Sequence, residues 1–205
     1  MGKVINYLRL SPLYEILFLL VQKYEFYRWT KRGKTLQPPH FIKRSLVRSY
    51  SLVYSCDILV ETGTYFGSMV NAVKDSFKNI YTIELDEKLY KRAKKKFAKY
   101  KHIRVLQGDS GKVLKDILTK LNEQALFWLD AHYSGGITAG EKHSPIEREL
   151  NKILSHRIKN HIILIDDALN FTGGDYPTMK ELESLVKKLR SEATILVKYN
   201  VIIIV

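Results

Sequence analysis

The sequence has few of the features that would assign it at once to a particular class of protein. It contains one cysteine, Cys56, which excludes an internal disulfide and a zinc site built from cysteines. Its longest apolar run, residues 13–21, is too short to cross a membrane and contains Glu15. No small-residue cleavage site follows this run, so a signal peptide is not indicated. The low cysteine content leads us to expect a cytoplasmic location. The sequence also shows no internal repeat, no low-complexity segment and no RNA-binding motif.

Acidic residues are outnumbered: 34 Lys and Arg against 21 Asp and Glu give a net charge of +13. Such an excess favours anionic partners, but it does not choose among nucleic acid, a lipid surface and an acidic substrate. Most of the excess lies in residues 1–50, where aromatic residues between Tyr14 and Trp29 are followed by a basic run at 31–34. A helix expected from Pro12 to Trp29 would either cover the substrate cleft or lie on a membrane surface. We therefore expect a helical extension over 1–44 and a main domain over 45–205.

Strand and helix patterns alternate through the main domain. Short apolar runs, most of them rich in β-branched residues, predict strands at 57–60, 80–84, 103–110, 126–130 and 162–167, with a closing hairpin at 193–198 and 201–205. Helical patterns separate them, and Ser144 and Thr178 are expected to begin capping boxes. The helix expected over 86–100 is rich in lysine, which we interpret as a solvated outer face. The alternation predicts an α/β fold, a doubly wound sheet with its last strand antiparallel.

The first predicted strand ends in a turn that contains two glycines four positions apart, Gly63 and Gly67. This spacing is not the G-x-G-x-x-G of dinucleotide-binding proteins, and it would cradle a pyrophosphate poorly. A strand, a glycine turn and a helix from Ser68 would place a ligand at a helix N-terminus above the carboxyl edge of a parallel sheet. The turn therefore favours a cofactor without a phosphate, although a glycine turn without any ligand is the alternative.

The segment Glu61-x-Gly63-x-Tyr65-x-Gly67 resembles the first motif of class I S-adenosylmethionine-dependent methyltransferases, most closely the catechol O-methyltransferase branch. The resemblance covers roughly residues 45–205 and implies a Rossmann-like sheet of seven strands with S-adenosylmethionine as cofactor. In this interpretation Glu84 holds the ribose hydroxyls, and Asp109 with Ser110 meets the adenine. The implied cofactor-binding residues are Glu61, Gly63, Thr64, Tyr65, Gly67, Ser68, Glu84, Asp109, Ser110 and Asp130.

Acidic residues close all five predicted parallel strands, and the last two of these ends resemble a metal site. Leu129–His132 and Ile165–Asp167 are similar to the metal positions of catechol, caffeoyl-coenzyme A and macrocin-type sugar O-methyltransferases. The resemblance implies that Asp130, Asp166 and Asp167 bind Mg²⁺, which prefers hard oxygen ligands. The catechol enzymes carry a lysine base where this chain has Tyr133, so we expect His132 and Asp130 to be the catalytic residues. A histidine that stacks near the adenine, or Asp130 acting as base without a metal, is the alternative.

The resemblance implies in-line methyl transfer to a hydroxyl of a small, diol-bearing acceptor such as a sugar or a phenol, with Mg²⁺ lowering the pKa of the hydroxyls. A basic extension above the cleft would favour an acidic acceptor. Nucleic acid is not expected as a partner, because the strand-end acids would repel phosphates. The sequence is also compatible with peripheral membrane contact through residues 12–34 and with a homo-oligomer. The alternative class is a non-catalytic module that binds RNA or a membrane on the same fold.

Overall fold

The computed structural model describes residues 12–33, 38–130 and 144–205, with side chains described from Leu20 onward. The chain divides into two compact units, Met1–Ser45 and Leu46–Val205. The first unit contains α2 (Pro12–Lys31) and the beginning of α3 (His40–Val53). Within it the Phe26 ring packs edge-on against Phe41, with 5.9 Å between the ring centroids. No helix in the described part of the chain is long and apolar enough to cross a membrane.

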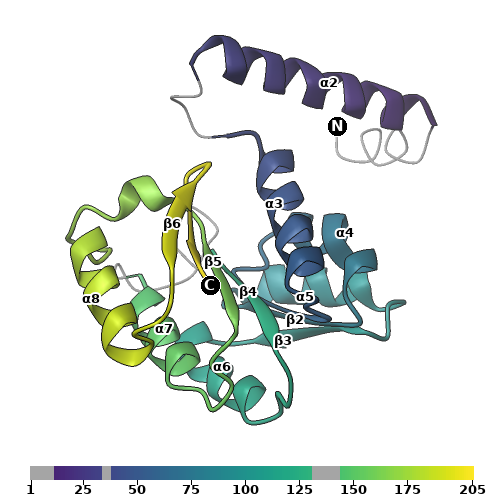
Figure 1. Cartoon of the computed structure of the whole chain (residues 1–205). Helices are drawn as coiled ribbons and strands as arrows, with labels where there is room; N and C mark the ends of the chain where they lie inside the picture. Colours follow the sequence, from purple (N-terminus) through teal and green to yellow (C-terminus); the bar gives the residue numbers. More distant parts are fainter. Residues whose placement is uncertain (1–11, 34–37, 131–143) are drawn as a thin grey trace. The chain divides into compact units, whose positions relative to one another are not determined.

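The second unit is built on a seven-stranded sheet in the order β3-β2-β1-β4-β5-β7-β6 (Figure 1). The pairs from β3 to β5 are parallel, whereas β7 runs antiparallel to both β5 and β6. This arrangement confirms the predicted doubly wound sheet. In chain order the strands are β1 (Ile58–Thr62), β2 (Asn79–Glu84), β3 (Ile103–Gln107), β4 (Ala125–Leu129), β5 (Ile162–Ile165), β6 (Ile195–Lys198) and β7 (Val201–Ile204).

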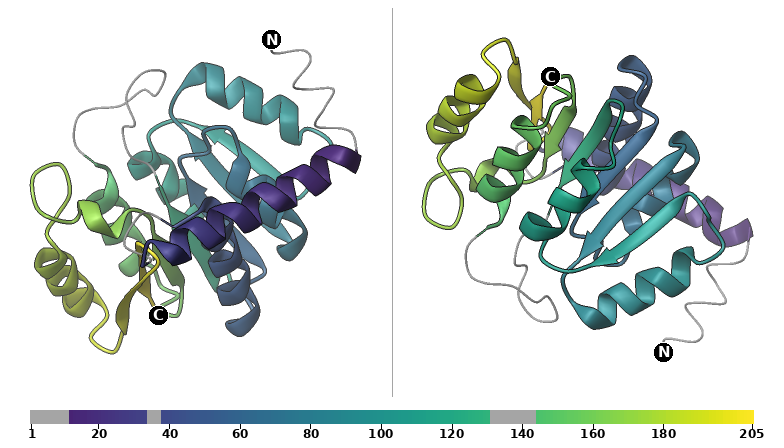
Figure 2. Two further views of the ribbon diagram at one scale, coloured as in Figure 1. Left: turned by 90° about the horizontal axis from the view of Figure 1, so that it is seen from above. Right: turned by 90° about the horizontal axis from the view of Figure 1, so that it is seen from below.

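Helices cover both faces of the sheet (Figure 2). Successive residues of β1 point to opposite faces, so that Leu59 joins one hydrophobic cluster while Ile58 and Val60 join the other. The first cluster lies under the second half of α3, α4 (Ser68–Val73) and α5 (Glu87–Phe97). The second lies under α6 (Ser110–Leu118), α7 (Ile146–Leu154) and α8 (Met179–Leu189).

Local signals in the sequence were correct at α8 and in the hairpin but wrong at α7. Thr178 and Glu181 form the predicted capping box of α8. Tyr199 and Asn200, both at positive φ, make the two-residue turn between β6 and β7. At α7 the N-cap is Pro145 and no side chain caps the helix. Ser144 precedes the N-cap residue by one position, so its hydroxyl does not form the capping bond of a capping box. It accepts a hydrogen bond from Ile146 N instead, at 3.4 Å.

Candidate active site

The turn between β1 and α4 is held against β2 by its own backbone. Gly63 N and Thr64 N both donate to Ile83 O, at 3.0 and 3.1 Å, and Gly67 N donates to Thr64 O at 2.7 Å. Gly63 and Gly67 adopt φ values of 84° and 65°, in the left-handed region that glycine tolerates without strain. The two glycines therefore set the path of the loop.

Gly67 also permits a close approach between this loop and α5. A Cβ atom at Gly67 would lie 2.6 Å from Cε2 and 2.8 Å from Cζ of Phe97. Lys96 Nζ donates to Phe66 O at 2.7 Å and to Gly67 O at 3.1 Å from the same helix. No side chain other than hydrogen fits at this position while Phe97 stays in the core.

Glu84 lies at the end of β2 and is buried beside the loop. Its Oε2 accepts from Tyr65 N at 2.7 Å, and its Oε1 accepts from Asp86 N at 3.0 Å. The carboxylate thus joins the β1–α4 loop to the start of α5. It stands at the position where an acid receives ribose hydroxyls in nucleotide-binding folds.

Glu61 is inside the fold rather than at its surface. Thr82 Oγ1 donates to Glu61 Oε2, and the hydroxyls of Thr82 and Thr64 are 2.5 Å apart. Burial, together with the charges of Asp130 and Glu84, raises the pKa of Glu61 to about 8, against the lowering effect of the Thr82 hydrogen bond. Glu61 therefore connects through Thr82 to the loop residue Thr64, and it is largely protonated below pH 8.

Asp109 and Ser110 meet at the start of α6. Asp109 is the N-cap residue, and its Oδ1 accepts from Lys112 N at 3.0 Å. Its Oδ2 lies 3.4 Å from Arg148 Nη2 on α7. The Asp109 carboxylate is thus engaged as a helix cap and in an ion pair, and Ser110 beside it is buried.

The ends of β4 and β5 bring Asp130 and Asp166 to one place. Asp130 N donates to Thr62 O at 3.1 Å, and Asp166 N donates to Leu129 O at 2.9 Å. Both acids line a small, partly open cleft. The other residues that line it are Leu129, Ser144, Ile146, Glu149, Ile165 and Tyr176.

Asp167 is oriented differently from its neighbour. It adopts φ 58°, its N–H donates to Asp166 Oδ1 at 2.7 Å, and its Oδ1 accepts from Asn200 Nδ2 at 3.2 Å. Among residues 12–33, 38–130 and 144–205, no group of three His, Cys, Asp or Glu side chains is placed to hold a metal ion. His132 and the glycine-rich segment around it lie outside the described residues.

Sequence reasoning missed Glu149, which lies on the buried side of α7 and is 1% exposed. Its Oε1 and the buried Thr62 Oγ1 have no hydrogen-bond partner among the described residues. Burial raises the pKa of Glu149 to about 7, while the nearby hydroxyls of Ser110 and Thr62 lower it. The signal was available, because the apolar positions Ile146, Leu150 and Ile153 put an acid on the inward face of the helix.

Sequence comparison gives no relatives: no family model and no curated protein matches the chain. Solved structures do match. The S-adenosylhomocysteine-bound methyltransferase PaMTH1 from Podospora anserina is 17% identical over 99% of this chain and 93% of that one, with a TM-score of 0.53. A Staphylococcus aureus protein assigned as a caffeoyl-CoA O-methyltransferase is 14% identical over 93% and 97%, with a TM-score of 0.58.

The O-methyltransferase TomG from Streptomyces achromogenes, in complex with S-adenosylmethionine and involved in tomaymycin synthesis, is 12% identical. The match covers 89% of this chain and 87% of that one, with a TM-score of 0.56. Together with the strand order and the antiparallel β7, these likenesses show that the chain has the class I methyltransferase fold.

Proposed function

We propose that the chain is an S-adenosylmethionine-dependent methyltransferase that methylates a hydroxyl group. The observation that carries the proposal is the β1–α4 turn, in which both glycines adopt left-handed φ values and the backbone is fixed to Ile83 and Glu84. The turn opens at the carboxyl edge of the sheet, where ligands of α/β folds bind. The comparisons support the assignment, because three matched structures are named as methyltransferases and two of them contain the cofactor or its product.

The residues of this edge fit the cofactor in three parts. The loop from Gly63 to Ser68 would receive the methionine part, and Glu84 would accept the ribose hydroxyls in place of its present backbone donors. Ser110 would meet the adenine. Glu61 would support the loop through Thr82 rather than contact the cofactor directly. Asp109 caps α6, so Ser110 rather than Asp109 is the candidate for the adenine contact. The bound cofactor supplies a methyl group on a positively charged sulfur, which is open to in-line attack by an oxygen.

The acceptor would enter the cleft beside Asp130. Asp130, Glu149, Asp166, Ser144 and Tyr176 give this cleft hydrogen-bond acceptors, and none of its described lining residues is Lys, Arg or His. A small hydroxyl-rich group, such as a sugar or phenolic diol, suits these acceptors better than an anion. Asp130 would accept the hydroxyl proton as the oxygen attacks, and His132 is the other candidate base.

The described side chains do not form the Mg²⁺ site that the resemblance implies, because Asp167 is directed to Asn200. Asp130 and Asp166 carry the hard oxygens that would bind Mg²⁺ if it takes part. Chelation tests this directly: with a metal, chelator abolishes turnover and leaves cofactor binding intact, and added Mg²⁺ restores activity.

A screen of sugar and phenolic diols tests the function. Incubation with S-adenosylmethionine should give a product heavier by one methylene group, detected by mass spectrometry. Binding of S-adenosylhomocysteine without turnover on any acceptor would favour the non-catalytic alternative. Removal of residues 1–40 should leave cofactor affinity within a small factor of the wild type and alter acceptor use or membrane contact.

A further inference from the structure

The net positive charge of the chain comes from two segments. Residues 85–104 carry nine Lys and Arg against two acids, Asp86 and Glu87. Residues 1–50 carry ten against two, and the rest of the chain carries 15 against 17. The methyltransferase-fold unit is therefore close to neutral except along α5 and the turn that follows it.

On α5 the charges form a stripe along one side of the helix. Leu89, Ala93 and Phe97 are buried against the sheet. Lys88, Arg92 and Lys95 on α5, and Lys99 in the turn directly after it, recur every three or four residues, so they share one side, and all four are exposed. At 1.5 Å per residue the stripe is about 16 Å long. We call these four residues the α5 stripe.

The α5 stripe contacts the β1–α4 loop of the candidate site through Arg92. Arg92 Cζ lies 4.4 Å from the centre of the Phe66 ring. Tyr65, which is 46% exposed, packs against Phe66 with 4.1 Å between the ring centroids. A row of cations thus passes beside two aromatic rings at the loop of the candidate site, and one of these rings, Tyr65, is exposed.

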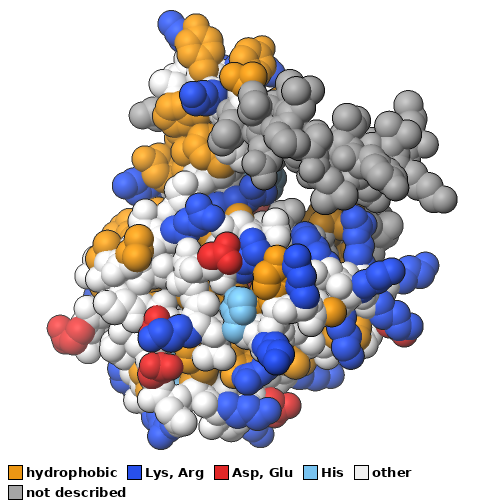
Figure 3. Space-filling view, turned by 90° about the vertical axis from the view of Figure 1, so that its right-hand side faces the viewer, with side chains coloured by type: hydrophobic (Ala, Val, Ile, Leu, Met, Phe, Trp, Pro, Cys, Tyr) orange, Lys and Arg blue, Asp and Glu red, His pale blue; other side chains and the backbone are white. Residues whose placement is uncertain are grey.

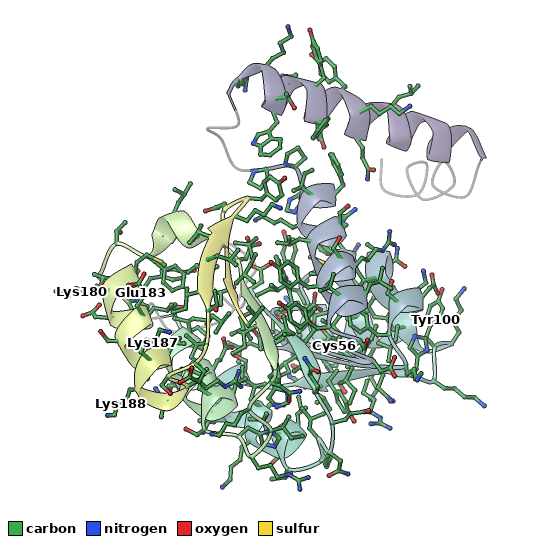
Figure 4. The ribbon with its side chains drawn as sticks, viewed as in Figure 1. Cys56, Tyr100, Lys180, Glu183, Lys187 and Lys188 are labelled. Carbon is green, nitrogen blue, oxygen red and sulfur yellow. The ribbon has the colours of Figure 1, made fainter. Side chains whose placement is uncertain are left out.

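Figures 3 and 4 show where this charge lies on the second unit. Tyr100, just after α5, is on the right-hand side of the unit in Figure 4. Figure 3 views the molecule from that side and shows Lys and Arg side chains gathered there. Lys180 and Lys188 of α8 lie on the opposite side in Figure 4, which makes them suitable for a control.

We propose that the α5 stripe binds the phosphate backbone of single-stranded nucleic acid, with a base stacked on Tyr65. Cations that follow a strand beside an aromatic ring are the general means of binding single strands. A membrane surface fits less well, since α5 exposes no apolar residue that could enter the lipid. Binding by the α5 stripe does not depend on the proposed function.

The strand-end acids do not oppose this binding. Glu84, Asp166 and Asp167 are buried, and the raised pKa of Glu61 keeps it largely protonated at neutral pH. The acids thus face the cleft while the cations face solvent along α5. A strand can run along the helix and place only an uncharged sugar or base near the acids.

The test is fluorescence anisotropy with the full chain and a labelled single-stranded RNA of about 20 nucleotides, at about 50 to 300 mM salt. The double variant Lys88→Glu/Lys95→Glu alters two residues of the stripe and leaves the Arg92–Phe66 contact in place. The control Lys180→Glu/Lys188→Glu changes the net charge by the same amount on α8. Circular dichroism and S-adenosylhomocysteine calorimetry check that each variant folds and keeps the candidate cofactor site.

The wild type should bind RNA with an affinity that falls steeply with salt. The α5 variant should bind at least about tenfold more weakly at about 100 mM salt, with a log–log salt slope smaller by about 1.4. The control should stay within about threefold of the wild type. Equal losses in both variants, no salt-sensitive binding by the wild type, or binding to anionic vesicles but not to RNA would each overturn the proposal. If the wild type binds S-adenosylhomocysteine but not RNA, nucleic-acid binding by the α5 stripe is refuted and the proposed function stands.

Discussion

Replacing Gly67 by alanine tests whether the β1–α4 loop depends on its contact with α5. The new Cβ would lie 2.6 and 2.8 Å from two ring atoms of Phe97, which is 2% exposed and fixed in the core. Alanine at φ 65° costs about 1 to 2 kcal/mol by itself. Overpacking against a buried ring adds about 1 to 3 kcal/mol. We expect Gly67→Ala to lower the free energy of unfolding by about 2 to 5 kcal/mol.

Gly174 provides a matched control, because it adopts φ 86° and a Cβ there would meet no atom within 4 Å. Gly174→Ala should therefore cost only the backbone term, about 1 to 2 kcal/mol. Urea unfolding of the two variants measures the difference, and calorimetry should show weaker S-adenosylhomocysteine binding for Gly67→Ala. Equal destabilisation of the two variants would refute the argument that steric contact with Phe97 requires glycine.

Three further predictions follow from the described contacts. Glu84→Gln replaces one acceptor oxygen that faces Tyr65 N or Asp86 N by a donor, so S-adenosylhomocysteine affinity should fall at least about tenfold, by calorimetry. Glu149→Gln removes an acid whose folded-state pKa is raised to about 7, so the folded wild type holds a proton that its unfolded state loses above pH 4.5. The stability of the variant relative to the wild type should therefore rise between pH 5 and 8, by about 3 kcal/mol at most, and a difference that does not vary with pH would contradict a buried, protonated Glu149. Thr178→Ala should cost about 1 kcal/mol in urea unfolding through loss of the α8 capping box, and a neutral result would show that Glu181 caps the helix alone.

The fold could be predicted from the sequence because its elements have strong local signals. Each parallel strand is a short apolar run, and β1, β4 and β5 are buried along their whole length. The hairpin could be placed because two β-branched runs flank Tyr199-Asn200. The ends of the strands were predicted less accurately. Asp109, Asp130 and Asp166 were placed inside strands, but they follow them, at positions where the backbone has left the sheet and the side chain caps a helix or lines the cleft.

The candidate site was harder to predict, because side-chain partners there come from distant segments. Nothing near Asp167 in the sequence indicates that Asn200 will donate to its carboxylate. Asp109 could be placed beside an adenine, but its pairing with Arg148 depends on how α6 and α7 pack. Glu149 shows the reverse, because the helical spacing of Ile146, Leu150 and Ile153 is enough to place its side chain on the inward face of α7.

Isothermal titration calorimetry of the unmodified chain with S-adenosylhomocysteine, and with NAD as the competing dinucleotide, tests the central claim most directly. The β1–α4 turn, with two glycines four positions apart and Glu84 beside it, predicts saturable binding of S-adenosylhomocysteine and none of NAD. Binding of NAD without binding of S-adenosylhomocysteine would contradict the proposed cofactor and the methyltransferase activity built on it.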